Sequence, residues 1–128
     1  MASLKSGKIR PHDHMAKACR GGYRFGSRTW RCWDDKGVHG SMDMFDAFRE
    51  SCDVYYYQVG LIIGMDIINQ TARDFGFGQP TGIDLEAERT GELIDSASYN
   101  HRFRKRGWKW TRGLVLNLSI GQGQIATP

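Results

Sequence analysis

The chain has 128 residues, enough for one domain, and its 40% hydrophobic residues and mean hydropathy of −0.52 indicate a modest core. A net charge of +4 favours an anionic partner such as nucleic acid, a membrane surface or an acidic polymer, without choosing among them. No apolar run reaches the roughly 18 residues of a membrane-spanning helix. Residues 1–5 lack the apolar segment of a signal peptide, so we expect any targeting segment to lie outside this sequence.

The N-terminal part, residues 1–40, is polar and rich in Gly, His and Arg, with little periodicity. It predicts irregular chain with a short ribbon around Tyr23–Phe25 and Thr29–Trp33. Residues 42–50 have the amphipathic pattern of a helix, which Ser41 or Asp43 could cap.

A break at Ser51–Asp53 separates that helix from two more. Asp53 can cap a helix that runs to about Ile63 and is apolar nearly all round, which predicts burial. Gly64 is expected to end it. A third helix is predicted from Asp66 to Phe75, with Gly76 as its C-terminal stop.

The C-terminal part is predicted to be loop over residues 76–100, followed by a basic and aromatic segment at 101–112. Leu114–Leu118 indicates either a strand or the start of a buried helix, and a Gly-Gln-Gly turn at 121–123 follows. Residues 126–128 are typical of a helix start, with Pro128 in the first turn.

The triplet Ser51-Cys52-Asp53 is the first candidate site. A serine and a carboxylate at the junction of two apolar helices are costly to bury unpaired, which favours a functional role. The alternative from spacing alone is that both residues only cap the following helix.

Three cysteines and a histidine form the second candidate, with the spacing Cys19-x12-Cys32-x6-His39-x12-Cys52. Four such ligands could bind zinc, although a zinc finger usually pairs its ligands two to four residues apart. The alternatives are a Cys19–Cys32 disulfide with Cys52 buried as a small apolar residue, or metal binding by the run His12-Asp13-His14.

Three segments carry a family resemblance: Glu50–Gly60 (ESCDVYYYQVG), Phe75–Leu85 (FGFGQPTGIDL) and Asn117–Gly123 (NLSIGQG). In this order they resemble the class B penicillin-binding proteins, the cell-wall transpeptidases, and among them the elongation or rod-shape type, penicillin-binding protein 2-like. The resemblance extends over residues 7–128.

The resemblance implies an α/β (α+β) penicilloyl-serine-transferase fold, in which an antiparallel sheet is joined to a helical subdomain. We expect this chain to be an internal, partial transpeptidase domain that supplies mostly the helical subdomain with loops. It would comprise a zinc-stabilised loop region (1–40), a helical core with the Ser-x-Asp motif (41–76), and a loop region approaching the sheet (77–128).

For the site, the resemblance implies that Ser51 and Asp53 occupy the Ser-x-Asn motif, with Asp in place of the commoner Asn. The family's nucleophile is the serine of Ser-x-x-Lys, and a Lys-Thr-Gly strand completes the cleft. No serine here has a lysine three residues later, and Lys5-Ser6-Gly7 precedes the triplet, which is the wrong order. We therefore expect an inactive fragment whose nucleophile lies upstream.

Rod-type enzymes resembling this chain carry a structural zinc beside the motif, which implies Zn²⁺ bound by Cys19, Cys32, His39 and Cys52. The resemblance also implies peptidoglycan stem peptides as substrates, β-lactams as inhibitors of the full protein, a glycosyltransferase of the elongation machinery as partner, and an inner-membrane anchor with the domain in the periplasm.

The segment His101–Arg112 interleaves basic and aromatic residues. Such segments bind single-stranded nucleic acid, an anionic membrane or a cell-wall polymer, or are simply a solvated loop. No nucleic-acid-binding motif accompanies it, so nucleic acid is not expected. The competing hypothesis for the whole chain is a non-catalytic, zinc-stabilised basic module for an anionic polymer or nucleic acid.

Overall fold

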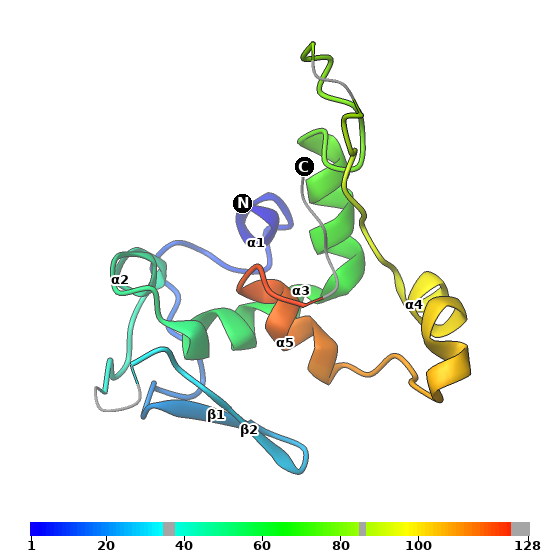
Figure 1. Cartoon of the computed structure of the whole chain (residues 1–128). Coiled ribbons are helices and arrows are strands. Elements are labelled where there is room, and N and C mark those ends of the chain that lie inside the picture. Colours follow the sequence, from blue (N-terminus) through cyan, green and yellow to red (C-terminus); the bar gives the residue numbers. More distant parts are fainter. Residues whose placement is uncertain (35–37, 85–86, 124–128) are drawn as a thin grey trace.

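The computed structural model describes residues 1–34, 38–84 and 87–123, and this part of the chain is mostly helical with one small sheet (Figure 1). None of its helices is long and apolar enough to cross a membrane. Its elements in chain order are α1 (Ala2–Lys5), β1 (Gly22–Phe25), β2 (Arg28–Arg31), α2 (Met44–Arg49), α3 (Asp53–Asp74), α4 (Ser96–Phe103), the 3₁₀ turn η1 (Arg104–Arg106) and α5 (Gly113–Ser119).

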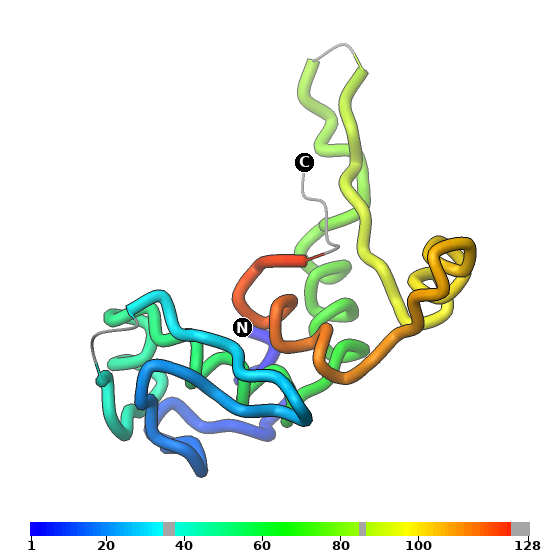
Figure 2. The backbone as a smooth tube through the Cα atoms, turned by 60° about the horizontal axis from the view of Figure 1, so that its bottom comes forward, coloured from blue at the N-terminus to red at the C-terminus, as the bar shows by residue number. Residues whose placement is uncertain are grey.

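The N-terminal part is irregular chain around an antiparallel ribbon, as predicted. β1 and β2 pair with Gly22 opposite Arg31 and Phe25 opposite Arg28. The ribbon and α2 lie beside the first half of α3 (Figures 1 and 2). The single-turn helix α1 was not predicted, because it has no apolar periodicity; it packs on α3, and Lys5 forms an ion pair with Asp74.

The predicted helix at 42–50 is present as α2, and Asp43 is its N-cap, accepting a hydrogen bond from the Asp46 N–H at 3.0 Å. The predicted break at Gly64 is also present. Gly64 has φ 78° and ψ 168° inside α3, a backbone conformation that only glycine adopts readily. The helix bends there, so its two halves point in different directions (Figure 1). Gly76, with φ 86°, follows the end of α3.

Leu114–Leu118, for which either a strand or a helix was predicted, lies in the helix α5. This helix packs against α3. The two helices approach closely at Gly60, where a Cβ atom would lie 2.6 Å from Ser119 Cβ. Leu116 is completely buried in the same core as Val54.

The expectation of loop over residues 76–100 is wrong from Ser96 onward, where α4 begins. Asp95 caps this helix by accepting from the Ser98 N–H at 2.7 Å. The sequence pattern is weak because only Tyr99 and Phe103 of α4 are buried. The predicted helix start at 126–128 lies outside the described residues.

Candidate metal centre and Ser-x-Asp site

Ser51 lies in a strained turn between α2 and α3. Its φ is +50°, and among the described residues only Ala87 is another non-glycine with positive φ. A left-handed conformation costs a non-glycine residue about 1 kcal/mol or more and persists where the surroundings impose it. The turn leaves the Ser51 side chain exposed next to buried Cys52.

Asp53 was predicted to cap α3, but the N-cap residue is Cys52, whose side chain makes no capping hydrogen bond. The Asp53 carboxylate instead accepts from the backbone N–H of Trp33 at 2.8 Å. Asp53 does not act as the cap because the loop after β2 places the Trp33 N–H within hydrogen-bonding distance of its carboxylate. Burial raises the pKa of Asp53, and the Trp33 hydrogen bond opposes that shift.

Trp33 is a site residue that the sequence did not reveal. Besides its contact with Asp53, its indole Nε1 donates to the backbone carbonyl of Glu50 at 2.9 Å. The residue therefore contacts both sides of the Ser51 turn. Its only signal in the sequence was its position next to Cys32, which does not predict a contact with residues 50–53.

The four predicted metal ligands come together. The Nδ1 atom of His39 lies 3.4 Å from Cys19 Sγ and 3.5 Å from Cys32 Sγ. The four ligand atoms, including Cys52 Sγ, all lie within 4.8 Å of one another. Each thiol is at most 3% exposed.

Backbone contacts fix three residues of this Cys/His cluster in place. Cys19 and Gly40 form an isolated antiparallel bridge, with N–H to carbonyl distances of 2.8 and 3.1 Å, which holds the His39 loop against Cys19. The Cys32 N–H donates to Gly21 at 2.9 Å, and the Cys52 N–H donates to Ala47 at 2.9 Å. The cluster thus joins the ribbon, the His39 loop and the start of α3.

The donor set fits a tetrahedral zinc ion. Zn–S bonds of about 2.3 Å and Zn–N bonds of about 2.0 Å put neighbouring ligand atoms roughly 3.5–3.8 Å apart. The distances of 3.4 and 3.5 Å from His39 Nδ1 to the Cys19 and Cys32 sulfurs are close to this range. Burial raises the pKa of the Cys52 thiol to about 12 and also raises the pKa of Cys32. Burial therefore favours the neutral form of the Cys32 and Cys52 thiols, and a divalent cation is the partner that would hold them as thiolates.

Both alternatives to this cluster fail in the structure. The Cys19–Cys32 disulfide, the first alternative, is not formed, because all three cysteines are free. In the described part of the chain, no metal-binding group includes the run 12–14. His12 lies instead 3.1 Å from an Asp43 carboxylate oxygen, and His14 lies 3.0 Å from the Ser41 hydroxyl.

Side chains at the start of α3 also hold the irregular N-terminal segment. The hydroxyls of Tyr55 and Tyr57 donate to the carbonyls of Asp13 and Arg31, at 3.0 and 2.9 Å. The Gln58 amide accepts from the Lys17 N–H and donates to the Lys17 carbonyl. The run from Tyr55 to Gln58 therefore serves as a set of anchors for chain that forms little secondary structure.

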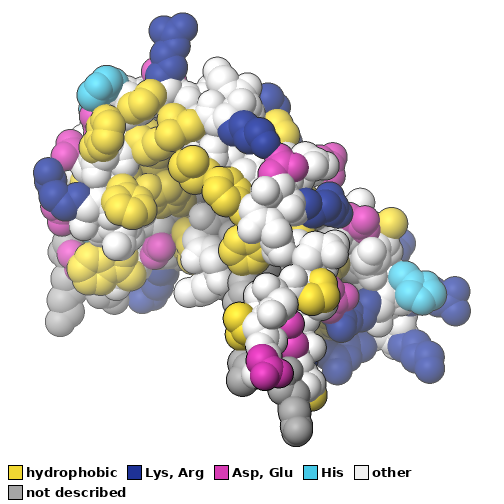
Figure 3. All heavy atoms as spheres, turned by 90° about the horizontal axis from the view of Figure 1, so that it is seen from above, with side chains coloured by type: hydrophobic (Ala, Val, Ile, Leu, Met, Phe, Trp, Pro, Cys, Tyr) yellow, Lys and Arg dark blue, Asp and Glu magenta, His cyan; other side chains and the backbone are white. Residues whose placement is uncertain are grey.

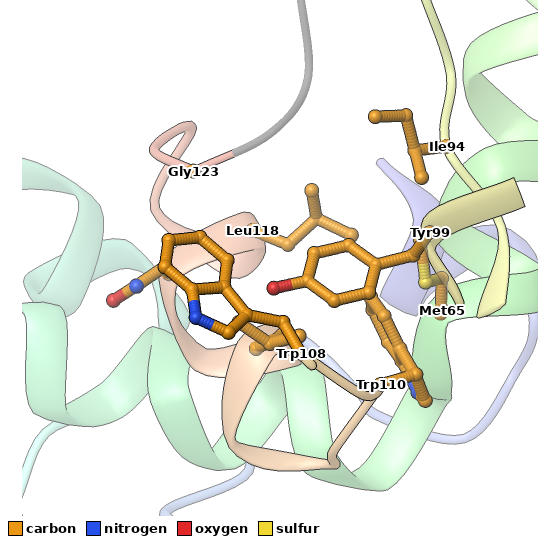
Figure 4. Close-up of a pocket in the computed structure, with 9 residues that line it drawn as sticks. Met65, Ile94, Tyr99, Trp108, Trp110, Leu118 and Gly123 are labelled. Atoms are coloured by element: carbon orange, nitrogen blue, oxygen red, sulfur yellow. The ribbon is translucent and has the colours of Figure 1, made fainter. Parts of the chain in front are cut away.

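Apart from the triplet and the Cys/His cluster, the structure has a hollow of about 160 Å³ between α3, α4 and α5. Figure 4 shows the rings of Tyr99, Trp108 and Trp110 around it, together with Met65 and Leu118. Its lining is predominantly apolar and contains no carboxylate, thiol or histidine, so it offers no acid–base pair. The triplet and the Cys/His cluster remain the candidate chemistry.

Lys5-Ser6-Gly7 lies at the end of α1 and not on a strand, and Lys5 is engaged with Asp74. This placement does not match the Lys-Thr-Gly strand of the resembled family.

Sequence and structure comparisons define the family. Residues 1–127 match the model of the penicillin binding protein transpeptidase domain, and the chain belongs to this family. It is 40% identical over 114 residues to the peptidoglycan D,D-transpeptidase MrdA of Salmonella typhimurium, and 43% identical over 103 residues to MrdA of Acinetobacter baumannii. The alignments cover 81% and 80% of this chain but only 18% and 15% of those relatives.

Solved structures agree with this assignment. Penicillin-binding protein 2 of Helicobacter pylori, in a complex with MreC, superimposes with a TM-score of 0.84 at 31% identity, covering 98% of this chain and 23% of that one. Penicillin-binding protein 2 of Pseudomonas aeruginosa, in complex with WCK 5153, gives a TM-score of 0.82 at 26% identity, covering 98% and 28%. The expected penicillin-binding protein 2-like resemblance and α+β transpeptidase fold are confirmed.

Proposed function

We propose that the chain supplies the Ser-x-Asp wall of the active site in a peptidoglycan D,D-transpeptidase of cell-wall elongation. The observation that carries this proposal is the Ser51 turn, which holds an exposed hydroxyl in a strained backbone conformation between two packed helices. The similarity to MrdA supports the reaction class. Because the chain spans less than a fifth of those relatives, the rest of the active site would come from segments not contained in this sequence.

The reaction proposed is acyl transfer by a serine nucleophile. The serine of a Ser-x-x-Lys motif attacks the carbonyl of the penultimate D-Ala of a stem peptide, and the terminal D-Ala leaves as an amine. An amine of a second strand then attacks the acyl-enzyme, restores the serine and forms the cross-link. β-Lactams acylate the same serine.

In this reaction Ser51 relays a proton, because a hydroxyl can donate and accept at once. It would pass the proton between the lysine and the leaving amine. Asp53 would orient that lysine or accept from the substrate amide. Its hydrogen bond to Trp33 gives it a second task, which is to fasten the loop after β2 to the triplet.

The metal proposed for Cys19, Cys32, His39 and Cys52 is Zn²⁺. Four protein ligands leave no open position, so the ion would be structural. It would hold the ribbon and the His39 loop against the start of α3. With Cys52 inside the triplet, the bound ion would fix the backbone next to Ser51.

The wider assignments follow from the same family. We propose a zinc-stabilised loop region at 1–40, a helical core at 41–76 and a region approaching the sheet at 77–128. The substrates would be peptidoglycan stem peptides, and the whole protein would be anchored in the inner membrane with this domain in the periplasm. An elongation glycosyltransferase would be its partner, and the MreC complex of the Helicobacter pylori protein suggests a second.

Labelled penicillin tests the proposal. The 128-residue chain should not react, whereas a longer protein that adds the Ser-x-x-Lys and Lys-Thr-Gly segments should form one adduct. In that longer protein Ser51→Ala should slow acylation by roughly 10²–10⁴-fold, the usual contribution of a proton relay. Labelling of the 128-residue chain on one of its own serines would refute the assigned roles, and an unlabelled longer protein would refute the function.

A further inference from the structure

The positive charge of the chain is concentrated in one part of the fold. Residues 96–128 contain six Lys and Arg residues and no Asp or Glu, whereas residues 1–95 contain twelve Lys and Arg and fourteen Asp and Glu. The whole chain has a net charge of +4, so this last quarter carries +6 and the rest carries −2. A separation of this kind marks a surface that attracts anions.

We call this surface the basic lobe, formed by α4, η1 and the following loop up to residue 112. Figure 3 shows dark blue side chains gathered at the end of the molecule where α4 lies. All six cations of the lobe are exposed: Arg102, Arg104, Lys105, Arg106, Lys109 and Arg112. Three of them are consecutive in the 3₁₀ turn η1, so they point outward in different directions.

The aromatic rings of the lobe pack against one another. Tyr99 packs on Phe103 and Trp110, with ring centroids 4.6 and 5.5 Å apart. Trp108 stacks on Phe103 at 5.5 Å, and the Arg106 guanidinium lies 5.5 Å from the Trp108 ring centroid. The rings of Tyr99, Trp108 and Trp110 also line the hollow of Figure 4. Tyr99 and Phe103 are buried and Trp108 is 49% exposed. The lobe therefore offers one half-exposed ring, whereas stacking of successive nucleobases or insertion into a bilayer uses several.

The guanidinium groups can bind oxyanions. Four of the six cations are arginines, whose planar fork matches a carboxylate or a phosphate. The lobe contains one such pair within the chain, between Arg102 and Glu92. Cations spread around a turn suit a flexible strand that can bend around them, whereas a membrane presents a plane.

We propose that the basic lobe is a docking surface for a peptidoglycan strand, which it binds through the carboxylates of the stem peptides. The proposal rests on the proposed function, because that function supplies a polymer with carboxylates at repeated intervals. Docking through η1 would hold a strand on the enzyme independently of the Ser51 site. It would raise the local concentration of stem peptides without contributing to the chemistry.

The test is co-sedimentation of the 128-residue chain with purified insoluble peptidoglycan over a series of salt concentrations. The lobe variant replaces Arg104, Lys105 and Arg106 with Gln. The matched control replaces Lys8, Arg10 and Arg20 with Gln, which removes the same charge from exposed positions elsewhere. We expect binding that weakens with salt, a loss of roughly 10–100-fold in the lobe variant, and little change in the control.

Three further probes decide the nature of the partner. Peptidoglycan whose carboxyl groups have been amidated should bind as weakly as the lobe variant binds untreated peptidoglycan. Equal binding of both variants, or undiminished binding to amidated peptidoglycan, would overturn the proposal. So would stronger binding to phosphatidylglycerol vesicles or to a dT oligonucleotide than to peptidoglycan.

Penicillin labelling separates this proposal from the proposed function. In the longer protein, the lobe variant should retain one penicillin adduct while losing affinity for peptidoglycan. Loss of labelling in the lobe variant with unchanged affinity would contradict docking and place these cations in the acylation site. Failure of the unmutated longer protein to label would refute only the proposed function.

Discussion

Replacing Ser51 with glycine should stabilise the fold and abolish the proton relay. The φ of +50° at this position costs an L-residue roughly 1–2 kcal/mol, and glycine avoids that cost. Glycine also gains more conformational freedom in the unfolded chain, which removes about 0.5–1 kcal/mol of the benefit. The net expectation is an increase of about 0.5–1 kcal/mol in the free energy of unfolding.

The assay is thermal or urea unfolding of the wild-type chain and three variants. For a domain of this size the expected gain raises the Tm by roughly 2–5 °C. Ser51→Ala keeps the Cβ atom and should remain within about 0.5 kcal/mol of the wild type, because the side chain is exposed. Ala87→Gly is the matched control, since Ala87 has φ +58° in a loop away from the triplet.

Stability and activity should therefore change in opposite directions at Ser51. In the longer protein Ser51→Gly should lose penicillin acylation, while Ala87→Gly gains stability and keeps acylation. A Ser51→Gly chain that unfolds more easily than Ser51→Ala would refute the reasoning. It would mean that the turn is not strained and that its backbone conformation is no evidence for a site.

Four other substitutions test the packing, hydrogen bonding and helix capping around the site. Gly60→Ala should lower the free energy of unfolding by about 1–3 kcal/mol, since the new Cβ would meet Ser119, and adding Ser119→Gly should restore most of it. Tyr57→Phe should cost about 1 kcal/mol by removing the hydrogen bond to the β2 carbonyl, measured by urea unfolding. The hydrogen bond from the Asp46 N–H lowers the pKa of the Asp43 carboxyl. The stabilisation of the fold by the ionised Asp43 cap should therefore be complete above about pH 4 and be lost as the pH falls through the lowered pKa. Asp43→Asn should keep the cap and remove this pH dependence, and an unchanged pH profile would contradict the assignment.

Local rules predicted the elements with strong local signals. The ribbon, the Asp43 cap, the break at Gly64 and the stop at Gly76 all depend on residues whose conformational preferences are nearly independent of context. The grouping of Cys19, Cys32, His39 and Cys52 was predicted because thiols and imidazole are few and chemically distinctive and because the family resemblance implies that these four positions lie together.

The remaining features depend on contacts distant in sequence. Asp53 was expected to cap its own helix, but a loop twenty residues upstream supplies the Trp33 N–H and competes for the carboxylate. The start of α4 was missed because only two of its residues are buried. The anchoring role of Tyr55, Tyr57 and Gln58 was missed for another reason. An apolar helix pattern does not show where polar side-chain ends will find their partners.

The most direct test of the account is the zinc content of the purified chain, combined with thiol titration before and after a chelator. The account predicts about one zinc per chain, with Cys19, Cys32 and Cys52 protected until the metal is removed. Chelation should also lower the Tm, because bound metal stabilises only the folded state. A metal-free chain whose three thiols react at once would contradict the metal centre and remove the support that it gives to the Ser51 turn.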